Sequence, residues 1–233
     1  MTVAGMVPVS LVDYPGHVAT TLFLAGCNLR CPYCHNPGLV VGPPAGPPLA
    51  EDRVLEFLRA RRGQLGHVCV TGGEPTQHPG LARLLAACKE LGYRVKLDTN
   101  GSHPERLGVL LRKGLVDYVA MDVKTSWSRY GELGGDPVPA DVLRASVALI
   151  QADAPDHEFR TTVVPGLVDH ADILAIATGL RGARRYALQQ FVVQGPLLDP
   201  GWATVVPYPA ATLRGWAAEA AAATGVPVEV RNA

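Results

Sequence analysis

The chain has 233 residues, a length that fits one large α/β domain or two small ones. Hydrophobic residues make up 48% and charged residues 18%, so there is ample material for a core. The formal net charge of zero argues against a broad surface for nucleic acid or an anionic membrane, and we expect neither partner.

The first 17 residues do not resemble a secretion signal, because they lack a basic opening segment and Asp13 interrupts their apolar stretch. No apolar run approaches the about 18 residues that a bilayer span needs. We therefore expect a cytoplasmic protein with reduced thiols, and its five cysteines indicate metal or redox chemistry before disulfides.

Apolar runs alternate with amphipathic stretches along the whole chain. A first strand is predicted at residues 18–26, and an irregular loop follows to about Pro48. That loop ends in the Gly- and Pro-rich run 42–48, which excludes helix and central strand. Helix–strand pairs are then predicted at 51–62 and 67–71, 80–91 and 94–98, 104–113 and 116–122, 141–151 and 158–164, and 169–180 and 185–191. A last helix at about 209–224 precedes a short strand at 226–230.

A βα unit repeated about six times implies a parallel sheet with outer helices. Two units are missing from a full eight-fold barrel, so we predict an open, partial (β/α)6 barrel. The chain forms one domain, with residues 1–17 as an N-terminal extension, 18–191 as the barrel core and 192–233 as a C-terminal helix and tail. A doubly wound sheet is the alternative, and in either fold ligands bind at the carboxyl ends of the strands.

Three cysteines, Cys27, Cys31 and Cys34, lie within eight residues directly after the first predicted strand. A short loop of this kind can place three sulfurs around a cubane, and thiolates are the usual ligands of iron–sulfur clusters. Three ligands leave one iron open to substrate. The alternatives are a structural zinc site and a disulfide. The neighbouring His35 would be an awkward fourth zinc ligand, and the compartment disfavours the disulfide.

The spacing C-x3-C-x2-C, with an aromatic residue before the third cysteine, resembles the signature of the radical S-adenosylmethionine (radical SAM) superfamily. The runs SLVDYPG at 10–16, FLAGC at 23–27 and CHNP at 34–37 resemble the activating enzymes of glycyl radical enzymes. The anaerobic ribonucleoside-triphosphate reductase activating protein group is the most similar, over residues 10 to about 191. The resemblance implies one 4Fe–4S cluster held by the three cysteines and S-adenosylmethionine as cofactor.

The resemblance also implies a reaction and its partners. The reduced cluster cleaves S-adenosylmethionine to a 5′-deoxyadenosyl radical, which takes a hydrogen atom from a glycine of a glycyl radical enzyme, here anaerobic ribonucleoside-triphosphate reductase. Reduced flavodoxin or ferredoxin donates the electron, and the complex with the target enzyme is transient. Because this chemistry needs no separate general base, the histidines other than His35 are interpreted as surface or capping residues. The isolated Cys69 and Cys88 are interpreted as buried apolar residues.

Further family motifs follow the later predicted strands. In TGGEP, at 71–75, the resemblance implies that Gly72, Gly73 and Glu74 contact the amino group of S-adenosylmethionine. Two glycines allow close backbone approach, and a carboxylate pairs with an ammonium. The alternative is a simple strand-to-helix turn.

LDTNG at 97–101 and MDVK at 121–124 end the next two strands. The resemblance implies that Asp98, Thr99, Asp122 and Lys124 surround the ribose, the methionine carboxylate and a bound monovalent cation. Lys124 suits a carboxylate as a point charge, and the other three offer oxygen ligands to a hard cation. Helix capping and loop solvation are the alternative, above all for Asp98.

Two further residues take roles from the resemblance. Arg160 matches a family arginine near the cofactor, and its alternative is a solvent-exposed strand charge. Tyr33 is expected to place its backbone near the adenine while its ring packs the cluster loop. Residues 189–191 show no residue match to the pyruvate formate-lyase type, so the adenine-side contacts there stay open.

Two rival functions remain. A radical SAM enzyme acting on a small molecule, such as 7-carboxy-7-deazaguanine synthase, shares the cluster and a shortened barrel, but the run VDYPG at 12–16 favours the activase. A non-enzymatic zinc- or cluster-binding module leaves the ordered motifs at four strand ends unexplained.

Overall fold

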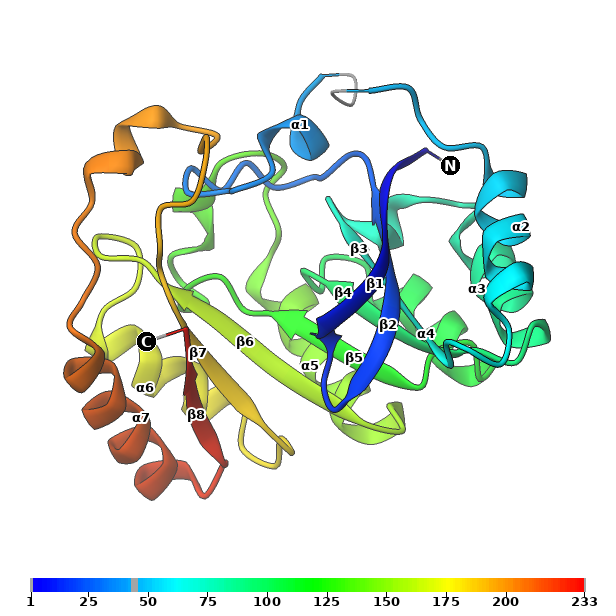
Figure 1. Ribbon diagram of the computed structural model, residues 1–233. Helices are drawn as coiled ribbons and strands as arrows, with labels where there is room; N and C mark the ends of the chain where they lie inside the picture. The colour runs from blue at the N-terminus through cyan, green and yellow to red at the C-terminus, as the bar shows by residue number, and fades with distance from the viewer. Residues whose placement is uncertain (1, 43–45, 233) are drawn as a thin grey trace.

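An eight-stranded sheet forms the framework of the protein in the computed structural model, which describes residues 2–42 and 46–232. The strands lie in chain order from β1 to β8 and form a curved sheet (Figure 1). They are β1 (Val3–Tyr14), β2 (His17–Leu24), β3 (His67–Gly72), β4 (Arg94–Thr99), β5 (Tyr118–Asp122), β6 (His157–Val163), β7 (Tyr186–Gln190) and β8 (Val228–Arg231).

Strands β2 to β8 pair in parallel, each with the next along the chain. A doubly wound sheet grows in both directions from its first strand. This sheet grows in one direction only, so the predicted partial barrel is confirmed and its alternative is wrong.

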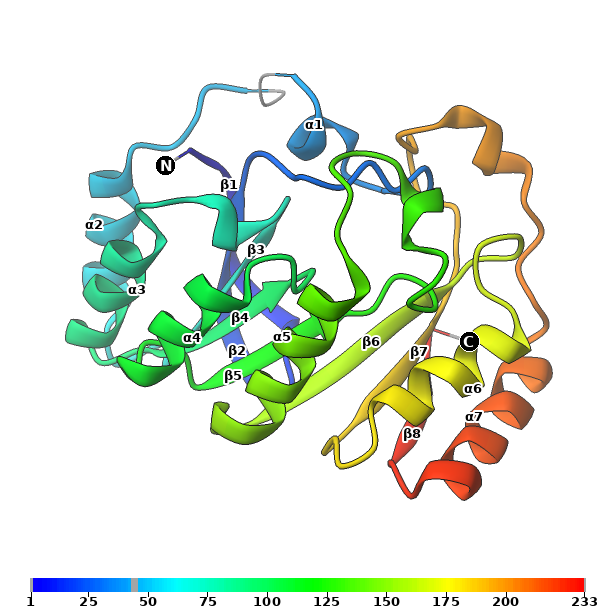
Figure 2. The ribbon, with the colours of Figure 1, turned by 180° about the vertical axis from the view of Figure 1, so that it is seen from behind.

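Helices cover the outer face of the sheet, as Figure 2 shows from behind. They are α2 (Glu51–Arg61), α3 (Leu81–Glu90), α4 (Pro104–Arg112), α5 (Ala140–Asp153), α6 (His170–Gly179) and α7 (Ala210–Thr224). Three 3₁₀ helices, η1 (Pro75–Gln77), η2 (Tyr130–Leu133) and η3 (Pro200–Thr204), and the one-turn α1 (Pro37–Val40) lie in the connections. None of the helices in the described ranges is long and apolar enough to span a bilayer.

Successive side chains of a strand point to opposite faces of the sheet, so the two faces can differ in character. In β4, Val95 and Leu97 are fully buried in the helix-side core, whereas Lys96 and Asp98 line a cavity inside the barrel. The outer helices therefore pack on an apolar face, and the inner face is free to carry charge.

The segment predicted as an N-terminal extension is strand β1, which pairs antiparallel with β2 through a turn at Pro15 and Gly16. Three register shifts, between Val3 and Gly5, between Val7 and Ser10, and between Ser10 and Tyr14, interrupt its alternation. The sheet therefore extends beyond the predicted core of residues 18–191 at both ends. Residues 43–45 of the predicted Gly- and Pro-rich loop lie outside the described part of the chain.

Candidate functional site

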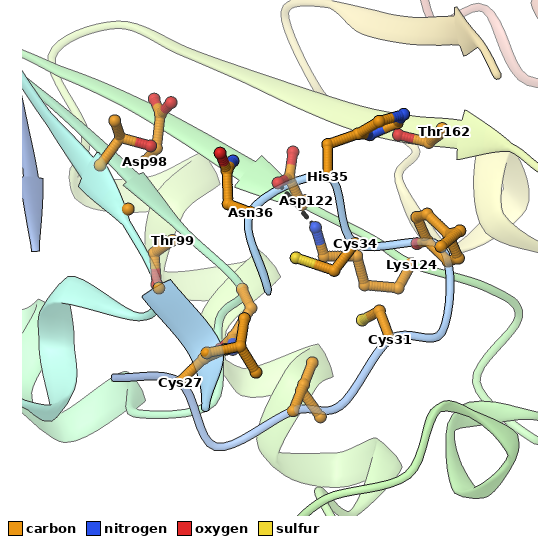
Figure 3. Close-up of a pocket in the computed structure, with 17 residues that line it drawn as sticks. Cys27, Cys31, Cys34, His35, Asn36, Asp98, Thr99, Asp122, Lys124 and Thr162 are labelled. Carbon is orange, nitrogen blue, oxygen red and sulfur yellow. Dashed lines mark hydrogen bonds and ion pairs between the residues drawn. The ribbon is translucent and has the colours of Figure 1, made fainter. Parts of the chain in front are cut away.

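A cavity of about 210 Å³ lies at the carboxyl ends of β3 to β6, under the loop that carries the three cysteines (Figure 3). Ten of the residues singled out from the sequence line it: Cys27, Cys31, Tyr33, Cys34, Gly72, Gly73, Asp98, Thr99, Asp122 and Lys124. Glu74 and Arg160 do not. Seven residues to which the sequence assigned no role at the cofactor complete the lining: Leu29, His35, Asn36, Val40, Thr71, Asn100 and Thr162.

The three cysteines are free thiols that share this cavity, so a disulfide between them is not formed. Burial raises the pKa of Cys31 to about 11, so iron must displace its proton on binding. Within residues 2–42 and 46–232, no three His, Cys, Asp or Glu side chains converge on a single metal ion. Three thiols spread around one cavity fit a cluster, which gives each thiolate its own iron, better than one zinc ion.

The backbone of the cysteine loop is held from three directions. On one side Arg30 N–H donates to Gly134 O at 3.1 Å, and Asp136 N–H donates to Asn28 O at 2.8 Å. On the other side Glu74 N–H donates to Gly26 O at 2.8 Å. These bonds tie the loop to the segments after β5 and β3.

The third attachment comes from the segment between β7 and α7. Leu198 N–H donates to Cys34 O at 3.0 Å, and Asp199 N–H donates to Pro32 O at 2.9 Å. His35 Nε2 lies 2.6 Å from Val192 O. This segment, residues 192–199, is called the strap below.

Glu74 is fully buried and does not line the cavity. Oε1 accepts from Thr76 N–H at 3.0 Å and from the Thr99 hydroxyl at 2.7 Å, and Oε2 accepts from Asn100 N–H at 2.6 Å. The Thr76 hydroxyl donates to Oε1 as well. Burial raises the pKa of Glu74, and these donors oppose the shift. Glu74 thus joins the segment after β3 to the end of β4, and its contact with the amino group of S-adenosylmethionine stays a prediction.

The glycines beside Glu74 are required by close backbone contact. A methyl group on Gly73 would lie 1.9 Å from Gly26 O, and one on Gly72 would lie 2.3 Å from Leu24 O. The TGGEP segment thus fits directly against the start of the cysteine loop.

Two carboxylates at the strand ends are already paired with cationic side chains. Asp122 accepts from Lys124 Nζ at 2.9 Å and from Arg160 Nε at 2.8 Å. Asp98 pairs with Lys96, and Arg160 Nη2 lies 3.3 Å from its Oδ2. Burial alone would raise the pKa of both carboxyls, but Arg160 and the adjacent lysine hold both pKa values below the ordinary range.

Arg160 faces a second cavity, of about 670 Å³, in the interior of the barrel. Its side chain is only 13% exposed, so the alternative of a solvent-exposed charge is wrong. Asp98 lines both cavities, which therefore adjoin. The second cavity is rimmed by Val12, Asp13 and Pro15 of the β1–β2 hairpin and by Arg231 and Asn232 at the end of β8.

Tyr33, Cys69 and Cys88 are buried, as their predicted packing roles require. The Tyr33 ring lies edge-on to Phe191, with 6.4 Å between the ring centroids. Among the histidines interpreted as surface or capping residues, His157 is only 1% exposed. It packs edge-on to Phe159, so that interpretation is wrong for His157.

The chain is similar to a known family and to several named proteins. The family model described as the radical SAM superfamily matches residues 21–176. A protein of Methanocaldococcus jannaschii with the provisional name glycyl-radical enzyme activating enzyme MJ1227 is 36% identical over 81% of this chain and 79% of its own. The 7-carboxy-7-deazaguanine synthase of Methanopyrus kandleri is 36% identical over 43% of this chain and 46% of its own. The pyruvate formate-lyase-activating enzyme of Clostridium pasteurianum is 36% identical over 49% and 48%.

A solved structure shows the same fold at low identity. Streptococcus suis SuiB bound to S-adenosylmethionine superposes with a TM-score of 0.68 and 15% identity, over 91% of this chain. This chain spans about half the length of SuiB, 52%.

Proposed function

Because this chain belongs to the radical SAM superfamily, we propose that it activates a glycyl radical enzyme through a 4Fe–4S cluster and S-adenosylmethionine. The observation that carries this proposal is that the three free thiols and the polar ends of β4 and β5 line one cavity. When bound, the cluster and its cofactor supply a 5′-deoxyadenosyl radical that takes a hydrogen atom from a glycine of the target enzyme.

Different residues of the cavity bind the cluster and different parts of S-adenosylmethionine. Cys27, Cys31 and Cys34 hold the cluster and leave one iron for S-adenosylmethionine. Lys124 offers its ammonium to the methionine carboxylate, since its Nζ lies in the cavity beside Asp122. The backbone of Gly72 and Gly73 meets the amino group.

Further residues act at the edges of the cavity. Tyr33 places its backbone on the adenine side, and Asp98, Thr99 and Asp122 lie on the ribose side. Because Asp98 and Asp122 are neutralised by lysine and arginine side chains, a monovalent cation is not needed to balance their charge. Arg160 aligns both carboxylates from the neighbouring strand.

The second cavity offers a route for the glycine of the target. It adjoins the first cavity at Asp98 and reaches the rim between the β1–β2 hairpin and β8. A short segment of a partner enzyme can enter there during a transient complex, while reduced flavodoxin or ferredoxin supplies the electron. Reduced thiols in the free protein suit a cytoplasmic location.

The small-molecule alternative, 7-carboxy-7-deazaguanine synthase, is favoured by matches to enzymes of that name, such as the enzyme of Methanopyrus kandleri. That match covers 43% of this chain, whereas the match to MJ1227 covers 81%. Activation of a glycyl radical enzyme therefore has the broader support. Anaerobic ribonucleoside-triphosphate reductase is the target that the sequence resemblance suggests.

The test begins with the reconstituted protein under anaerobic conditions. With dithionite and S-adenosylmethionine, we expect 5′-deoxyadenosine from the wild type and none from Cys31→Ala. Cys88→Ala removes a buried thiol on α3, outside the cavity, and should keep the activity. Full activity in Cys31→Ala would refute the ligand assignment.

The target is tested separately. Addition of anaerobic ribonucleoside-triphosphate reductase should give the doublet of a glycyl radical in its electron paramagnetic resonance (EPR) spectrum. Cleavage of S-adenosylmethionine without that doublet would reject this target. Formation of 7-carboxy-7-deazaguanine, the product named in the alternative, would favour the synthase.

A further inference from the structure

Asn100 makes a contact that sets Cys27 apart from the other two cysteines of the loop. Its Nδ2 lies 3.9 Å from Cys27 Sγ, within hydrogen-bond distance for sulfur. Among the described residues, Cys31 and Cys34 receive no side-chain hydrogen bond of this kind.

The orientation of the Asn100 amide is fixed by its neighbours. Oδ1 accepts from Ser102 N–H at 3.0 Å, and a backbone N–H can only donate, so the other amide atom must be the nitrogen. That nitrogen has two hydrogens. One is directed to Asn28 Oδ1 at 2.9 Å, which leaves the other for Cys27 Sγ.

Glu74 fixes the backbone of the same residue. Its Oε2 accepts from Asn100 N–H at 2.6 Å, and both residues are almost completely buried, at 0% and 5% exposed. The backbone N–H and both side-chain polar atoms of Asn100 therefore each have a hydrogen-bond partner, which holds the amide in place beside the sulfur. Glu74, which does not reach the cavity, acts on the cysteine loop through Asn100.

We propose that Asn100 is a positioning residue that raises the reduction potential of the cluster by donating a hydrogen bond to the Cys27 thiolate. This inference rests on the proposed function, because it concerns the cluster that the three cysteines hold. Reduction adds negative charge to the cluster, and a hydrogen bond to a ligand sulfur stabilises the more negative state. Partners outside the ligand set commonly tune a metal centre in this way.

Asn100→Ala and Asn100→Ser both remove the donor, because neither side chain can extend an amide to the sulfur. At a fixed applied potential, we expect about a tenfold smaller ratio of reduced to oxidised cluster, a downward shift of about 59 mV for a one-electron couple. The measurement is a redox titration of the reconstituted protein followed by the EPR signal of the reduced cluster.

Ser146→Ala is the matched control. The Ser146 hydroxyl donates to Gly101 O at 2.6 Å, so its loss also removes a hydrogen bond from the loop after β4 but leaves Cys27 untouched. The potential of this variant should equal that of the wild type. An equal downward shift in Ser146→Ala would mean that loop stability, not the sulfur contact, sets the potential.

The remaining outcomes are also decisive. Unchanged potentials in both Asn100 variants would overturn the inference. Failure of both variants to assemble a cluster would overturn it as well, because a tuning role leaves all three ligands in place. A wild-type protein without a cluster would instead refute the proposed function, so the two failures are distinguishable.

Discussion

Replacing Gly73 by alanine would test whether the TGGEP segment controls the position of the cysteine loop. The new methyl group would lie 1.9 Å from Gly26 O, whereas real Cβ atoms do not approach closer than 3.0 Å. The two segments must therefore separate by at least about 1 Å. Two backbone hydrogen bonds cross this contact, from Gly73 N–H to Leu24 O and from Glu74 N–H to Gly26 O, both at 2.8 Å.

The expected loss in the free energy of unfolding follows from those two hydrogen bonds. A buried backbone group left without its partner costs about 1–3 kcal/mol, so Gly73→Ala should lower the free energy of unfolding by about 2–6 kcal/mol. Native domains are typically stable by only about 5–15 kcal/mol. The displaced loop should also hold less iron after reconstitution.

The assay is urea denaturation of the protein without its cluster, followed by iron analysis after reconstitution. Gly215→Ala is the control, because Gly215 lies inside α7 with no atom within 4 Å of the added methyl group. Alanine should stabilise that helix by about 0.5–1 kcal/mol. If Gly73→Ala unfolds at the wild-type urea concentration and binds a full complement of iron, the close-contact reasoning is refuted.

Three further changes test the charged and hydrogen-bonded contacts described above. The pKa of Asp122 is lowered in the folded state, so the ionised carboxylate stabilises the fold. This stabilisation is present above pH 3.8, the ordinary pKa of the carboxyl group, and is lost as the pH falls below that value. Between about pH 6 and about pH 3, the urea concentration at the midpoint of unfolding should therefore fall less for Asp122→Asn than for the wild type. An equal fall in both proteins would contradict this. Arg129 Nη1 pairs with the buried Asp172 at 2.5 Å, and Arg129→Met should lower the free energy of unfolding by about 2 kcal/mol in urea; no change would mean that solvent replaces the pair. The Tyr186 hydroxyl donates to Thr161 Oγ1 at 2.9 Å inside the core, and Tyr186→Phe should cost about 1 kcal/mol in the same assay, whereas a gain would show that this bond is not net stabilising.

The parts of the site that are local in sequence could be predicted. Cys27, Cys31 and Cys34 occupy one short loop, so their spacing alone indicates that they share one site. The strand ends could be predicted as well, because the βα period locates them and a parallel sheet brings its carboxyl ends to one edge.

Contacts set by tertiary packing could not be predicted in the same way. The hydrogen bonds of the Glu74 carboxylate could not be predicted, because its donors include Thr99 at the end of β4 and Asn100 just after it. Asn100 lies within the motif LDTNG at 97–101. Its role requires the distance to Cys27, across 73 residues of chain, and no local pattern contains that distance.

Strand β1 was missed for a different reason. Pro8 and three register shifts disrupt the alternation by which strands are predicted, and proline and register shifts are both tolerated at the edge of a sheet. The turn at Pro15 and Gly16, between two β-rich runs, was the available signal for a hairpin. Gly16 adopts a φ of 74°, a conformation that favours glycine at this turn.

The strap has a consequence for the order in which the protein matures. Its bonds from Leu198 to Cys34 and from Asp199 to Pro32 join segments about 160 residues apart. At synthesis rates of about 5–20 residues per second, the cysteines leave the ribosome roughly 10–30 s before the residues that fix their loop. During that interval the thiols are open to oxidants and to competing metal ions. Insertion of the cluster after the strap has been synthesised would meet a loop already in its final shape.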